Sequence, residues 1–168
     1  MATATKTKVY RWVKDFLDRN EFYYEKDDKN KALCMGAPLT DKENSIAMVI
    51  SCDEMHLGIK ACFEHFADKK SHKNVMEYLM RVNYHLTNGC FVIDLDDGEV
   101  SFRTSLNLFE REMLSDDLIG LTLTGPLAMF NYYYKGLLYV MSGEKSPEEA
   151  VSEIFGSDNE SCSCGCEH

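Results

Sequence analysis

The residues with the clearest capacity for chemistry are three cysteines and a histidine within residues 162–168: Cys162, Cys164, Cys166 and His168. Thiols on alternate residues of an extended backbone point the same way, and the small Ser163 and Gly165 let the backbone wrap around an ion. Three thiolates and one imidazole complete a tetrahedral zinc shell, and thiolates also suit cuprous copper. The segment is therefore a candidate site for zinc or cuprous copper.

Two other interpretations of this segment stay open. Structural zinc sites usually draw ligand pairs from two separate segments, whereas these four candidate ligands are almost contiguous, so a metal bound by them would close no fold. The thiols could instead have a thiol–disulfide role, or the segment could be a flexible terminus with incidental cysteines.

The other four of the seven cysteines lie in apolar or strand-like stretches, where free cysteine behaves as a small buried hydrophobe: Cys34, Cys52, Cys62 and Cys90. We expect them in the core. An odd number of cysteines and the lack of a signal-length apolar run in residues 1–8 favour the cytoplasm, with reduced thiols.

The remaining polar residues form no recognisable catalytic set. No metal-ligand spacing relates the other four histidines, His56, His65, His72 and His85. His65 with Glu64 near Cys62 has no third group to orient it. The acidic stretch 94–99 has a leucine at a calcium-ligand position and strands on both sides, so it predicts a hairpin turn. We expect no enzyme activity.

Composition limits the classes of partner. The chain has 168 residues, 45% of them hydrophobic, and a formal net charge of -10. This charge repels phosphate backbones and anionic membrane surfaces, so nucleic acid is excluded as an expected partner. The acidic residues are concentrated after Gly143, which indicates one domain over residues 1–156 followed by an acidic, cysteine-rich flexible tail over 157–168.

Periodicity predicts the elements that build this domain. Helical spacing marks residues 9–20, 75–86 and 118–141, and a capping box at Ser146 starts a short fourth helix that runs to Phe155. Alternation and turn residues predict strands over 22–25, 32–37, 46–51, 55–61, 90–95 and 100–104.

Residues 118–141 are long and apolar enough to suggest a membrane span, but Gly125, Pro126 and several polar residues argue against it, so we expect no membrane insertion. A helix that is apolar around most of its circumference is buried on two sides. One side is expected to face the sheet and the other a second copy of the chain. The predicted interface of this homodimer, or of another partner, comprises Leu118, Met129, Tyr133, Leu137 and Val140.

The order of elements predicts the fold class. Strands joined by tight turns give an antiparallel sheet built from hairpins, with the helices packed on one face. The class is α+β.

Several segments resemble the YbjN-like family of small bacterial proteins. They are residues 74–83 (NVMEYLMRVN), 89–94 (GCFVID), 97–103 (DGEVSFR), 132–134 (YYY), 140–143 (VMSG) and 146–150 (SPEEA). The resemblance covers roughly residues 5–155 and implies the architecture of type III secretion chaperones, which are often dimeric. It also implies a sensory or regulatory role and carries over no active site. The cysteine tail lies outside the shared pattern.

Two functions are consistent with these observations. The first is a non-enzymatic, chaperone-like regulatory module that holds an unidentified protein partner on its sheet face or on the helix at 118–141. The alternative is a metal- or redox-responsive protein whose sensor is the cysteine tail.

Overall fold

The computed structural model describes residues 5–109 and 111–156, which form four helices and six strands. The elements are α1 (Lys6–Arg19), β1 (Glu25–Asp27), β2 (Ala32–Pro38), β3 (Ser45–Cys52), β4 (His56–Phe66), α2 (His72–Asn83), β5 (Cys90–Ile93), β6 (Glu99–Asn107), α3 (Asp116–Ser142) and α4 (Pro147–Gly156).

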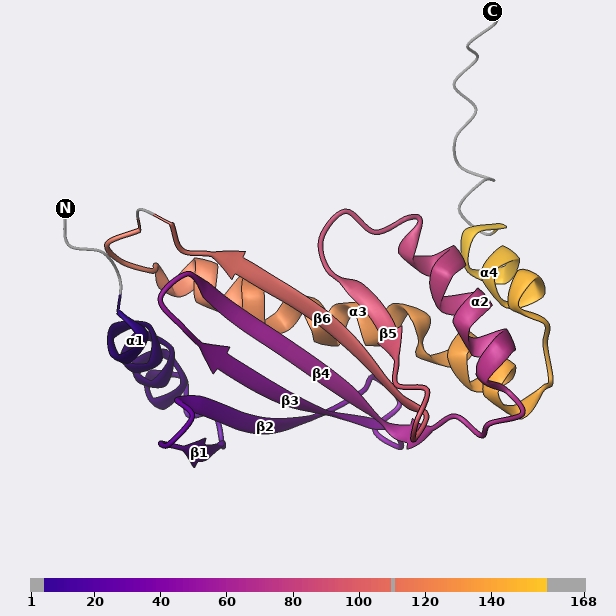
Figure 1. The fold of residues 1–168 in the computed structure, drawn as a ribbon, viewed down its shortest axis with the longest axis horizontal. Helices are drawn as coiled ribbons and strands as arrows, with labels where there is room; N and C mark the ends of the chain where they lie inside the picture. Colours follow the sequence, from indigo (N-terminus) through magenta and orange to yellow (C-terminus); the bar gives the residue numbers. More distant parts are fainter. Residues whose placement is uncertain (1–4, 110, 157–168) are drawn as a thin grey trace, which may run out of the picture.

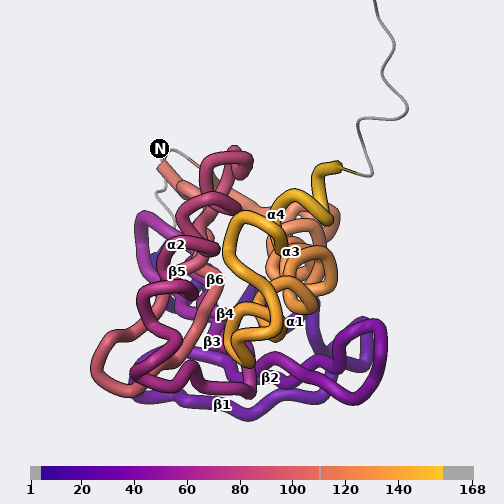
Figure 2. Tube along the Cα trace, turned by 90° about the vertical axis from the view of Figure 1, so that its right-hand side faces the viewer, coloured from indigo at the N-terminus to yellow at the C-terminus, as the bar shows by residue number. Residues whose placement is uncertain are grey.

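The strands form one antiparallel sheet in the order β1-β2-β3-β4-β6-β5. The long helix α3 runs along one face of the sheet, and α1 covers the same face beside it (Figure 1). Viewed from the end, α2 and α4 lie together next to α3 (Figure 2). The predicted α+β class and the antiparallel hairpin sheet are confirmed.

Alternating burial along β3 separates the two faces of the sheet. Ile46, Met48 and Ile50 are buried beneath the helices, whereas Ala47 and Val49 are exposed. Among the described residues, no helix covers the outer face of the sheet, and the inner face alone contributes to the main core.

Two clusters of buried side chains fill the space between sheet and helices. One is built around α1 and the N-terminal half of α3, with Leu17, Ile50 and Ile119 among its members. The other joins α2 and α4 to the C-terminal half of α3, with Tyr78 and Phe130 among its members. Helix α3 thus spans both clusters, and its middle lies between them.

Local signals explain most element boundaries. The side chain of Ser115 accepts from the amide of Leu118 and begins α3, and Gly143, at φ 75°, ends it in the left-handed region. The predicted capping box of α4 is formed, because Ser146 and Glu149 exchange hydrogen bonds. Helix α2 ends at Asn83, earlier than the periodicity predicted.

Candidate functional site

The predicted metal ligands Cys162, Cys164, Cys166 and His168 lie outside the described residues. Within residues 5–109 and 111–156, no group of three or more His, Cys, Asp or Glu side chains could hold a metal ion. The metal hypothesis therefore depends wholly on the tail.

The structure corrects the prediction that the four cysteines of the domain, Cys34, Cys52, Cys62 and Cys90, all lie in the core. Cys52 is buried, and burial raises the pKa of its thiol to about 12. Cys34 and Cys62 are only half-buried and Cys90 is exposed. These three belong to the outer face of the sheet, because their positions in the ladders align with Val49, Ala47 and Arg103 rather than with the buried register.

Cys62 and His65 make contacts with other side chains that do not activate the thiol as a nucleophile. Burial and a hydrogen bond with Glu99 raise the pKa of the Cys62 thiol, which disfavours the reactive thiolate. The imidazole of His65 contacts the side-chain oxygen of Asn44 at 2.8 Å. The pairing of Cys62 with His65 that the sequence suggested is therefore not a catalytic arrangement.

Three of the five predicted interface residues are covered by the chain itself. Tyr133, Leu137 and Val140 are buried in the cluster that α3 forms with α2 and α4. Their apolar character thus needs no second chain, because α2 and α4 supply the second covering layer. Leu118 and Met129 are half-buried, and both line a groove.

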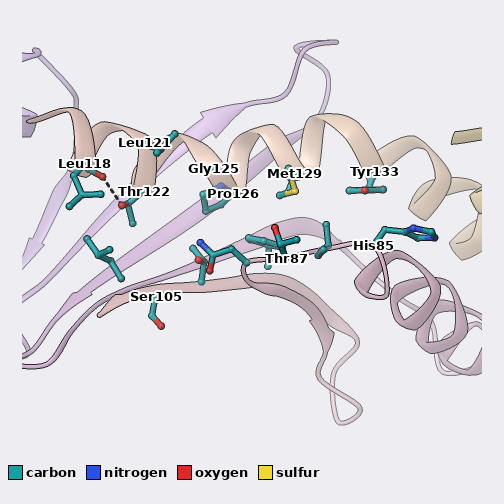
Figure 3. Close-up of a pocket in the computed structure, with 15 residues that line it drawn as sticks. His85, Thr87, Ser105, Leu118, Leu121, Thr122, Gly125, Pro126, Met129 and Tyr133 are labelled. Carbon is teal, nitrogen blue, oxygen red and sulfur yellow. Dashed lines mark hydrogen bonds between the residues drawn. The ribbon is translucent and has the colours of Figure 1, made fainter. Parts of the chain in front are cut away.

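This groove lies between α3 and β6, and it has a volume of about 540 Å³. In Figure 3, Thr122 and Met129 lie on the side of α3 that faces β6, and Leu121, from the same turn as Thr122, also lines the groove. Thr104 and Leu106 contribute from β6, and the connection between α2 and β5, residues 85–88, closes one end.

The sequence of α3 opens the groove at its middle. Gly125 has no side chain, and a Cβ built there would meet no atom within 4 Å. Pro126 has no N–H to donate to the carbonyl of Thr122, so the helix lacks one regular hydrogen bond at this point. The hydroxyl of Thr122 instead bonds within its own helix, to the carbonyl of Leu118 at 2.6 Å.

Apart from the imidazole of His85, the side chains that line the groove are uncharged. None of its lining residues, all within the described part of the chain, is Asp, Glu, Lys or Arg. Its surface combines apolar side chains with threonine, serine and asparagine. Such a lining suits uncharged apolar groups of a ligand, and among its side chains the groups suited to acid–base chemistry are the His85 imidazole and the Tyr133 phenol.

Sequence reasoning identified the groove residues Leu118, Met129 and Tyr133 but missed Thr104, Leu106 and Thr122. A signal for the helix side was present, because Gly125 and Pro126 interrupt an otherwise apolar helix. No feature of the sequence pointed to Thr104 and Leu106 on β6. They line the groove because β5 pairs with β6 only as far as Arg103, and a sequence pattern does not show this pairing.

Comparison with known families gives one match. The family model CesT_Tir_1, which represents type III secretion chaperone-like proteins, matches residues 6–124, most of the chain. This match supports the chaperone-like fold; the narrower resemblance to YbjN-like proteins stays a prediction. No curated protein matches the chain. Among the helices of the described residues, none has the length and hydropathy needed to cross a bilayer.

Proposed function

We propose that this chain, which belongs to the CesT_Tir_1 family, is a non-enzymatic, chaperone-like module that holds a segment of a partner protein in the groove between α3 and β6. The observation that carries the proposal is the uncharged groove itself, left open between the two core clusters of a chain with net charge -10.

The groove suits an apolar protein segment in size and chemistry. Burying one Leu or Phe side chain of a partner contributes about 1.5 to 3 kcal/mol. A volume of about 540 Å³ lies within the range of about 300 to 1,000 Å³ typical of ligand pockets. Two such side chains would therefore supply useful affinity.

We also propose the homodimer that the sequence suggested, with its contact moved to another surface. Met76, Met80 and Tyr84 lie four residues apart along and just beyond α2, and they are 40%, 70% and 86% exposed. Residues at this spacing share one face of a helix. Met80→Glu should therefore turn a dimer into a monomer in sedimentation experiments. A wild-type chain that stays monomeric at high concentration would contradict the dimer.

Site-specific photo-crosslinking tests partner binding in the groove. A photoreactive phenylalanine analogue at Thr122 faces the groove, whereas the same group at Thr124, which is exposed on α3, serves as the matched control. We expect a defined adduct in the native cell from position 122 and not from 124. The partner, once identified and purified, should bind the isolated chain. Equal labelling from both positions, or none from 122, would overturn the proposal.

A further inference from the structure

A second pocket, the β5–β6 pocket, lies on the outer face of the sheet at the hairpin that joins these two strands. It has a volume of about 330 Å³ and is lined by residues 92–95 together with Glu99, Ser101 and Arg103. Ser101 and Arg103 alternate along β6 with Val100 and Phe102, which are buried under the helices. The β5–β6 pocket shares no residue with the groove between α3 and β6, so it is a separate feature.

Ser101 gives the first indication of a ligand in this pocket. Only 1% of Ser101 is exposed, and its hydroxyl has no hydrogen-bond partner in the part of the chain that the structure describes. In that part of the chain, every side-chain oxygen that is sealed from solvent has a partner, so the Ser101 oxygen is open to the pocket that it lines. Buried polar groups normally form hydrogen bonds. The Ser101 hydroxyl is therefore available to a ligand.

Two cations next to Ser101 give the second indication. Lys60 on β4 lies directly opposite Arg103 on β6, and like charges in this arrangement destabilise a sheet. The Lys60 ammonium is compensated by Glu99 at 2.5 Å, and this hydrogen bond raises the pKa of Lys60. Arg103 is exposed and forms no ion pair with any described residue. An anionic group beside Arg103 would balance the charges of this part of the sheet.

A carboxylate is the anion that these donors suit. Ser101 and Arg103 are two residues apart on one strand, so their side chains share the outer face. A guanidinium binds a carboxylate through two parallel N–H bonds, and a serine hydroxyl donates one more. The pocket thus offers a carboxylate both charge and hydrogen bonds.

The acidic side of the pocket indicates a second group on the ligand. Glu99 is neutralised by Lys60, whereas Asp94 is exposed and forms no ion pair among the residues that the structure describes. One Asp94 oxygen accepts from the amide of Asp96 at 2.9 Å, which leaves the other oxygen for a ligand. The uncompensated charges of the lining are therefore one positive and one negative. A ligand that carries both a carboxylate and an ammonium balances them.

The rest of the lining is apolar. Val92 and Ile93 are half-buried, and Leu95 is 54% exposed. An apolar side chain of the ligand would remove part of this surface from water. The volume lies at the lower end of the range of about 300 to 1,000 Å³ typical of ligand pockets, so the ligand is small.

We propose that the β5–β6 pocket binds an apolar α-amino acid as its zwitterion. The carboxylate bonds to the Arg103 guanidinium and the Ser101 hydroxyl, and the ammonium bonds to Asp94. The apolar side chain lies against Val92 and Leu95. The chain would thus bind a small metabolite in addition to the protein partner of the groove.

Isothermal titration calorimetry of the full chain with L-leucine tests the class of ligand. We expect saturable binding of one molecule per chain. Isocaproate, which lacks the ammonium, and L-leucinamide, which lacks the carboxylate, should each bind about tenfold more weakly, because each leaves one charge of the lining without a partner. The absence of saturable binding for L-leucine, L-valine and L-methionine alike would overturn the proposal. Equal affinity for L-leucine and isocaproate would do the same.

Variants of the chain test the assigned contacts. Arg103→Gln should weaken L-leucine binding about tenfold, whereas Arg11→Gln, which removes the same charge from an exposed position on α1, should leave it unchanged. Ser101→Ala should weaken binding by about fivefold, the effect of one hydrogen bond. Asp94→Asn should remove the preference for L-leucine over isocaproate. Unchanged binding by Arg103→Gln would overturn the site, and thermal unfolding checks that each variant is folded.

Nuclear magnetic resonance of the isotope-labelled wild-type chain locates the ligand without any substitution. Adding L-leucine should shift the amide signals of residues 92–95 and 99–103 and leave those of residues 118–126 on α3 in place. Shifts confined to α3 would overturn the β5–β6 pocket and place the amino acid in the groove instead. The two sites share no residue, so either result leaves the photo-crosslinking test of partner binding independent.

Discussion

The hydroxyl of Tyr78 on α2 donates a hydrogen bond of 2.7 Å to the backbone carbonyl of Tyr133 on α3. Tyr78 is fully buried, and burial raises the pKa of its hydroxyl, which therefore remains a donor. A Cβ at Gly136 would lie only 2.5 Å from the Tyr78 oxygen, so glycine at this position permits the contact. The contact fixes the end of the groove wall near Tyr133 against α2.

Tyr78→Phe removes this hydrogen bond while keeping the ring. A typical intramolecular hydrogen bond contributes about 1 kcal/mol. For a chain of this size, that loss lowers the melting temperature by roughly 2 to 4 °C. Calorimetry of the wild type and the variant measures the shift. An unchanged melting temperature would show that the hydrogen bond adds nothing to stability.

Gly136→Ala should lower stability, although alanine is favoured over glycine in a helix by about 1 kcal/mol. The new methyl group overlaps the buried Tyr78 ring, and overpacking typically costs about 1 to 3 kcal/mol. Gly120→Ala on the same helix is the control, because its Cβ would lie 3.4 Å from the nearest atom of Phe16. Urea unfolding should show a loss for the first and none for the second. Equal gains for both would contradict the overlap.

The types and order of the helices and strands could be predicted from the sequence, because the periodicity and turn residues that indicate them are local signals. The α+β class, the four helices and the α4 capping box depend on spacing within a few residues. The N-terminal boundary of α2 did not follow, because its first turn, His-Lys-Asn, has no apolar periodicity. The first predicted strand, over 22–25, was also displaced, since β1 spans Glu25–Asp27.

The candidate site was less accessible to sequence reasoning because it depends on contacts between distant elements. The sequence indicated correctly that α3 is apolar around most of its circumference. We expected a second chain to cover one side of this helix, but α2 and α4 bury Tyr133 and Leu137. Similarly, an apolar sequence context suggested that Cys62 is buried, but strand register places it on the uncovered face. Both distinctions require knowing which helix covers which face.

Leu137→Asp should unfold the chain rather than release a folded monomer. Leu137 is 1% exposed, and its side chain lies in the cluster that joins α3 to α2 and α4. Truncation of such a buried leucine typically costs about 2 to 5 kcal/mol, and an unpaired buried charge costs more. Circular dichroism and light scattering together measure folding and mass. A well-folded monomer would support the original interface prediction instead.

The tail prediction is tested by comparing the full chain with one ending at Gly156. The reduced full chain should bind one zinc or cuprous ion, with affinity that falls as pH drops, because thiols with a pKa of about 8.5 must lose protons to coordinate. Cys164→Ser should weaken binding more than His168→Ala, since the central thiol joins both neighbouring chelate pairs. The shortened chain should bind no metal and keep its melting temperature within a few degrees. Equal metal uptake by both chains would contradict the site.

The carboxylate of Asp41 gives the chain a defined response to acid. Its oxygens accept from the amide of Asn44 and from the Asn44 side chain, and these bonds, together with those from Tyr134 and the Glu43 amide, lower its pKa from 3.8 to about 2. A lowered pKa in the folded chain means that the contribution of Asp41 to stability is present above its ordinary pKa. It is lost as pH falls toward about 2. Asp41→Asn removes this dependence, so the melting temperature of the wild type should exceed that of the variant at pH 6, and the difference should shrink as pH approaches 2. A constant difference over that range would show that the Asp41 charge does not stabilise the fold.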